Sequence, residues 1–137
     1  MIVYSINDYI ASDATLLSIL DLDEITLQPI IGDENSVAPF IIYRYNQDIK
    51  SEDMYYIHHD TIKYNIVDLD VDRGLRARNC IVNLLNRGDN IQDSVISDEY
   101  GRLLYVNLLT SSDISPSQPD GYFVFSLLFE VCWIQND

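Results

Sequence analysis

The chain has 137 residues, of which 47% are hydrophobic, and it contains ten tyrosines, four phenylalanines and one tryptophan. This length and composition predict a single domain over residues 1–137 and exclude a disordered chain. Its 22 acidic and 8 basic residues give a net charge of −14, which argues against a protein that binds nucleic acid by neutralising phosphates.

The sequence has neither of the usual marks of membrane insertion or secretion. No segment reaches the roughly 18 uninterrupted apolar residues of a membrane span, and the first residues lack the basic region of a secretory signal. Cys80 and Cys132 stand far apart without a CxxC pattern. We interpret them as small buried side chains in a reducing compartment, while one disulfide stays open on the sequence alone.

The N-terminal part has helical spacing. Apolar residues recur every three to four positions over residues 2–20, which predicts a helix. Ser12 and Asp13 interrupt this spacing and are both good N-cap residues. We therefore predict either one bent helix or a helix followed by a short second turn. Residues 25–31 predict a short strand that is irregular or at a sheet edge, because it contains Pro29.

The middle of the chain predicts two paired strands. Residues 39–45 form an apolar and aromatic run that opens on proline, and residues 61–69 alternate between apolar and polar. The inward side of the second strand is predicted to carry Ile62, Tyr64 and Ile66. Between the two strands, residues 46–60 are acidic and rich in tyrosine, which predicts a long hairpin arm or a flexible loop.

The longest predicted helix spans residues 70–86 and has one apolar stripe that can cover a sheet. Asp70 or Asp72 can cap its N-terminus, where a carboxylate also suits the helix dipole. Gly88 stands where a C-terminal cap glycine belongs. Residues 101–110 then predict a strand, and residues 111–120 consist of turn-forming types throughout.

The final strand, residues 122–134, organises the rest of the prediction. Its odd positions are all apolar: Phe123, Phe125, Leu127, Phe129, Val131 and Trp133. Its even positions are mixed: Tyr122, Val124, Ser126, Leu128, Glu130, Cys132 and Ile134. The odd side should form the floor of the core. The even side should meet a partner, such as another copy of the chain, or lie under a loop or helix of its own fold.

Two motifs suggest chemistry, and neither of them has the pattern that chemistry needs. Asp68, Asp70 and Asp72 lack the glycine and the bidentate glutamate of a calcium loop, so helix capping explains them better. His58 and His59 would point to opposite sides of a strand and have no third ligand nearby in sequence. No nucleophile elbow or phosphate-binding glycine loop is present. We therefore predict no catalytic residues, no cofactor and no metal.

Four of the eight basic residues lie on or near the longest helix: Arg73, Arg76, Arg78 and Arg87. Three of them are near its N-terminal half, where the helix dipole disfavours positive charge. Asp70 or Asp72 could compensate this charge locally. Alternatively, a positive subunit edge could dock on an acidic one of a neighbouring copy, which would build a head-to-tail ring.

Taken in order, these segments resemble a known family. The resemblance rests on Tyr9-Ile10-Ala11-Ser12-Asp13-Ala14-Thr15-Leu16, then Leu20, the strand at Ile25, Pro39-Phe40-Ile41-Ile42-Tyr43, the strand from Ile62, and the helix stripe Ala77, Ile81, Leu84 and Leu85. This order is similar to the tail terminator proteins of long-tailed bacteriophages, also called tail-completion or head–tail joining proteins. Residues 46–59 and 89–99 match nothing in that pattern.

The resemblance implies an α+β fold, with a mainly antiparallel sheet of four to five strands and two helices packed on one face. It implies a structural virion protein that assembles in the host cytoplasm into a hexameric ring at the head-proximal end of the tail tube. The ring would end tube growth and bind a neck protein of the capsid. DNA would pass through its acidic lumen without specific binding. The open alternatives are another neck or head-completion protein and a small acidic intracellular binding module or enzyme.

For a ring subunit, two groups of residues are expected to make contacts. The subunit interface is predicted to use Arg73, Arg76, Tyr122, Val124, Leu128 and Ile134. The contact with tube or neck is predicted to use Asp48, Glu52, Asp53, Tyr55 and Tyr56.

Overall fold

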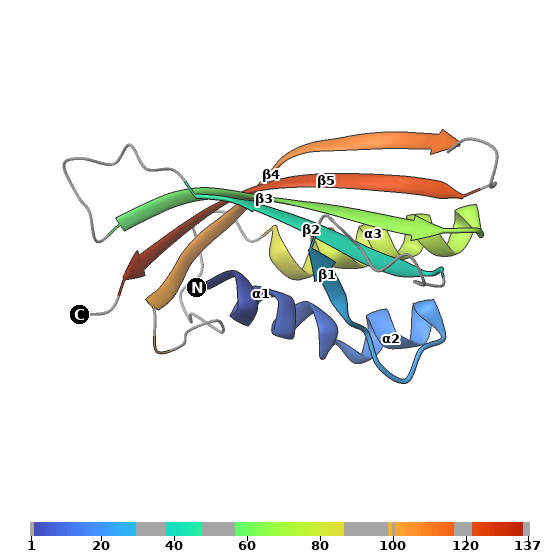
Figure 1. Ribbon diagram of the computed structural model, residues 1–137, viewed down its shortest axis with the longest axis horizontal. Coiled ribbons are helices and arrows are strands. Elements are labelled where there is room, and N and C mark those ends of the chain that lie inside the picture. The colour runs from blue at the N-terminus through green and yellow to red at the C-terminus, as the bar shows by residue number, and fades with distance from the viewer. Residues whose placement is uncertain are drawn as a thin grey trace.

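The computed structural model describes residues 2–29, 38–47, 57–86, 99, 101–116 and 122–135. Along the chain, its elements are α1 (Ile2–Ala11), α2 (Ala14–Leu20), β1 (Leu27–Pro29), β2 (Phe40–Asn46), β3 (Ile57–Asp68), α3 (Val71–Leu85), β4 (Gly101–Pro116) and β5 (Phe123–Gln135). The strands form one sheet in the order β1-β2-β3-β5-β4. Figure 1 shows this sheet as one layer and the helices as a second. The predicted α+β class is confirmed.

The N-terminal segment forms two helices, so the sheet is covered by three helices in the described part of the chain. Asp13 separates α1 from α2 because its carboxylate accepts a hydrogen bond from the Leu16 amide at 2.9 Å and caps α2. Asp21 ends α2 in the left-handed conformation with φ 55°. The break at Ser12 and Asp13 is therefore confirmed, but the segment after it is a seven-residue helix and not only a short turn.

The predicted strands pair as their sequences suggest. β2 and β3 are antiparallel, with Ile41 opposite Ile66, and β1 is a three-residue edge strand parallel to β2 that ends on Pro29. Ile62, Tyr64 and Ile66 point into the core, with at most 1% of each exposed. The Tyr64 hydroxyl donates to Asn7 Oδ1 at 2.8 Å, which ties β3 to α1.

β4 is longer than expected. Residues 111–116 have turn-forming side chains, yet their backbone continues β4 to Pro116 alongside β5. Three register shifts, near Leu103, Leu108 and Ser112, interrupt the pairing. Pairing with a neighbouring strand satisfies backbone hydrogen bonds that a turn would leave to local side chains, so the turn prediction is wrong for these residues.

The core lies between the helices and the odd side of β5. Phe125, Leu127, Phe129 and Val131 are all 0% exposed, which confirms that this side is the floor of the core. Above them, α3 buries Ala77, Ile81 and Leu85, and Asp70 caps this helix by accepting the amides of Asp72 and Arg73. The described part of α3 ends at the C-cap Asn86, and the predicted cap Gly88 lies outside the described residues.

Gly74 allows α3 to approach the sheet closely. A Cβ atom at this position would overlap the ring of Phe125, which is fully buried on β5. We expect Gly74→Ala to lower the free energy of unfolding by about 1–3 kcal/mol, since overpacking outweighs the better helix propensity of alanine. Denaturant unfolding measures this loss. An equally stable or more stable variant would show that the helix can move away from Phe125 at little cost.

Candidate functional site

Among the described residues, the side of the sheet opposite the three helices carries no helix (Figure 1). We call it the outer face. On β5 it carries the even positions, of which Val124, Leu128 and Ile134 are half-buried and Cys132 is buried. Tyr122, next to the start of β5, is also half-buried. Within the described residues no helix covers these side chains. This agrees with the alternative in which the even side of β5 meets a partner. Their role in a subunit interface remains a prediction.

Polar residues on the outer face are bonded across strands. The Ser126 hydroxyl donates to Asn65 Oδ1 at 2.5 Å. His59 Nδ1 lies 3.7 Å from Glu130 Oε1 and 3.4 Å from the Tyr105 hydroxyl. These contacts satisfy polar groups without making the surface hydrophilic throughout.

The outer face also carries two basic residues that sequence reasoning missed. Arg44 on β2 lies directly opposite Lys63 on β3, and both side chains are exposed. We call these two residues the basic pair. Both stand at polar positions of alternating strands, but only the register places them side by side.

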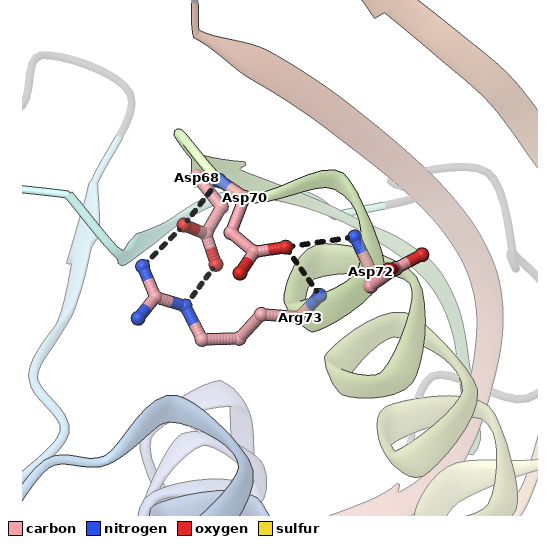
Figure 2. Close-up of polar contacts among 4 residues, drawn as sticks. All are labelled: Asp68, Asp70, Asp72 and Arg73. Carbon is pink, nitrogen blue, oxygen red and sulfur yellow. Dashed lines mark hydrogen bonds and ion pairs between the residues drawn. The ribbon is translucent and has the colours of Figure 1, made fainter.

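The arginines of α3 have different surroundings. Arg73 forms a bidentate ion pair with Asp68, with Nε at 2.8 Å from Oδ2 and Nη2 at 2.6 Å from Oδ1 (Figure 2). The Asp68 side chain is 0% exposed and that of Arg73 is 26% exposed. The positive charge of Arg73 is therefore compensated within the chain, and its ion-pair partner is Asp68. The expected ion pair with Asp70 or Asp72 is wrong for this arginine. Asp70 is occupied as the helix cap.

This ion pair controls the ionisation of Asp68. Burial alone would raise its pKa, but hydrogen bonds from Arg73 and from the Asp70 amide favour the carboxylate, so the pKa of Asp68 lies below its usual 3.8. The hydrogen bonds between Arg73 and Asp68 also raise the pKa of Arg73. The acidic motif therefore holds a strand-to-helix junction, as the capping interpretation predicted.

Arg76 is exposed and makes no ion pair with any other residue that the structure describes. It lines a cavity of about 410 Å³ between α2 and α3, together with Asp13, Thr15, Ile19, Asn79, Cys80, Asn83 and Leu84. The Cys80 thiol lies in this cavity and donates to Asp13 Oδ2 at 3.5 Å. Burial and the neighbouring carboxylate raise the pKa of Cys80 to about 11, so this thiol is protonated at neutral pH and is a poor nucleophile.

The two histidines lie in β3, in the stretch that pairs with β5 and extends beyond the described pairing with β2, so a place in a flexible loop is wrong for them. Their side chains make separate contacts, as alternation predicts. His58 stacks on Trp133 with ring centroids 4.3 Å apart, and His59 contacts Glu130 on the outer face. Among the residues described, no group of three or more His, Cys, Asp or Glu side chains could hold a metal ion.

Asp60 is the second buried carboxylate of the sheet, at 1% exposed. It accepts hydrogen bonds from the Tyr45 hydroxyl and from the Trp133 indole, the latter at 2.6 Å. Burial and the contact with Asp60 raise the pKa of Tyr45 above its ordinary value. These neutral donors join three strands, so the group is explained as a structural junction.

Three further observations concern the other predictions. The predicted tube or neck contacts, namely Asp48, Glu52, Asp53, Tyr55 and Tyr56, lie outside the described residues. Cys80 and Cys132 are both free thiols, so the open disulfide alternative does not apply. No helix in the described ranges has the length and apolar character to cross a membrane.

Comparison with known proteins shows a likeness at the level of structure. No protein-family model matches the sequence, and no curated protein matches it. Among solved structures, the chain is similar to a chain from the virion of a native gene transfer agent particle, with a TM-score of 0.63 and 13% sequence identity. The match covers 96% of this chain and 92% of the other. The two chains therefore share a fold over nearly their whole lengths.

Proposed function

We propose that this chain is a structural virion protein of a phage-type particle, and that it forms the ring that closes the head-proximal end of a tail tube. The observation that carries the proposal is the shared fold with a chain of a gene transfer agent virion, which extends over almost all of both chains. The order of segments along the sequence also resembles tail terminator proteins, and this resemblance supports the narrower role of closing the tail tube.

The geometry described above suits a subunit that works by contact. The outer face offers half-buried apolar side chains at Val124, Leu128 and Ile134, and Arg76 is exposed on the helical side. Surfaces on two different sides of one subunit are what a closed ring of identical copies requires. The ring is proposed to be hexameric, with one rim on the tube and the other on a neck protein. Its net negative charge would let DNA pass without adhesion.

The direct test mixes the purified protein with the tail tube protein of the same particle. We expect electron microscopy to show extra density at one end of each tube and tubes that stop growing. Binding to the capsid portal side without binding to tubes would instead indicate another neck protein. A monomer that binds neither would favour a small acidic binding module and would contradict the proposal.

Leu128→Asp tests whether the outer face is used in assembly. Leu128 is half-buried and lies opposite Lys63, so a carboxylate there would gain a cationic neighbour and the fold should persist. We expect this variant to lose ring formation and tube capping by about tenfold or more while its thermal unfolding changes little. Ala14→Asp, which adds the same charge to an exposed position on α2, is the matched control. Loss of folding in Leu128→Asp would show that this face is core.

A further inference from the structure

The basic pair is an anomaly in this protein. Arg44 and Lys63 are directly opposite each other across β2 and β3, and like charges in this position destabilise a sheet. The chain has only 8 basic residues and 22 acidic ones. Even so, neither member of the pair forms an ion pair with another residue in the described part of the chain.

Among the described residues, those paired with Lys63 across β5 and those of the two flanking cross-strand pairs are apolar or neutral, and the nearest acidic residue in the register is Glu130, diagonal to Lys63. Lys63 faces Leu128 on its other side, and the flanking cross-strand pairs are Ile42 with Asn65 and Asn46 with Thr61. Glu130 lies opposite Thr61 and is near His59. The outer face therefore presents a small positive patch with apolar residues beside it, on a molecule that is negative overall.

We infer that the basic pair is the docking point for an acidic surface of a second copy of this chain, an inference that rests on the proposed function as a ring subunit. The densest exposed carboxylates described lie just after α2, at Asp21, Asp23 and Glu24. They follow a helix, whereas the basic pair is on the opposite side of the sheet. Charge complementarity therefore joins two different surfaces of identical chains.

The positions of the basic pair and of the acidic residues favour one symmetry for the contact between two copies. If two copies met through the same patch, four positive side chains would face one another, which is unfavourable. We call Asp21, Asp23 and Glu24 the acidic turn. A contact between the basic pair of one copy and the acidic turn of the next copy is head-to-tail. Contacts of this type close into a ring when the rotation between copies allows it.

A charge swap tests the inference. Arg44→Glu with Lys63→Glu keeps a like-charged pair across β2 and β3 and reverses the sign of the patch. Asp23→Lys with Glu24→Lys reverses the acidic turn. We expect each double variant to self-associate at least about tenfold more weakly than the wild type in sedimentation at low salt. We expect the combined variant, or a mixture of the two, to recover association.

Arg78→Glu with Arg102→Glu is the control, because it changes the net charge by the same amount at other positions of α3 and β4. Circular dichroism checks that every variant is folded. The inference is overturned if the control weakens association equally, if the swap does not restore it, or if the wild type stays monomeric at all concentrations. It is also overturned if the patch variant loses binding only to tube protein or to DNA.

Different outcomes would contradict the proposed function and the docking inference. Self-association that follows the charge swap without any capping of tubes would overturn the terminator role and keep the docking surface. If the patch and turn variants cap tubes and their self-association is unchanged, the docking surface is overturned and the terminator role is kept.

Discussion

Arg73→Leu is expected to lower the free energy of unfolding by about 3 kcal/mol at neutral pH. Its guanidinium provides both side-chain hydrogen bonds to Asp68, whose side chain is 0% exposed. Without it, the buried carboxylate keeps the bond from the Asp70 amide but loses its counter-ion. Removing one partner of a buried ion pair is costly because the remaining charge stays desolvated. Urea unfolding at neutral pH measures the loss.

The loss should depend on pH in a defined direction. In the wild type, the pKa of Asp68 is below its usual 3.8, so the ion pair contributes stability above that value and loses it as pH falls through the lower folded pKa. In the variant, burial without the guanidinium should raise the pKa of Asp68. The stability difference between the two proteins should therefore be largest at neutral pH and shrink below about pH 4.

Arg76→Leu is the matched control, because Arg76 is exposed on the same helix and makes no ion pair with another described residue. We expect it to change stability by no more than about 0.5 kcal/mol. Equal losses in both variants, or a difference that does not vary with pH, would mean that the Asp68 ion pair is not what stabilises this junction.

Phe129→Ala is expected to lower the free energy of unfolding by about 3–5 kcal/mol. Phe129 is 0% exposed and packs edge-on against Tyr64, with ring centroids 6.2 Å apart. Its neighbour Leu128 points to the outer face and is half-buried, so Leu128→Ala should cost about 1 kcal/mol. Denaturant unfolding of both variants makes the comparison. Similar losses would show that both sides of β5 are buried in the isolated chain.

Much of the fold follows from local patterns. Alternation in β5 identified its core side from Phe125 to Val131, because successive side chains of a strand point to opposite faces whatever the neighbouring strand is. Asp70 was recognisable as a cap from its position before the apolar stripe, since capping depends on residues only two or three positions away. The pairing of β2 with β3 was predictable from two consecutive strands.

Other features depend on partners that are distant in sequence. β4 extends past residue 110 because β5 offers hydrogen bonds along its whole length, and this overrides the turn-forming side chains. Arg73 pairs with Asp68 and not with Asp70, because the end of β3 and the first turn of α3 bring the two side chains together while Asp70 is engaged as the cap.

By itself, the sequence determined which side of each main strand and helix is apolar, which residues are candidate helix caps, and that the molecule is strongly acidic. These properties depend on side-chain periodicity and on contacts within one turn. Only the tertiary structure decided that β5 lies between β3 and β4, that Arg44 faces Lys63, and that the outer face has no helix among the described residues. Backbone hydrogen bonds are nearly the same for every strand order and register, so these are selected by the packing of apolar sides and by turn geometry between segments that are distant in sequence.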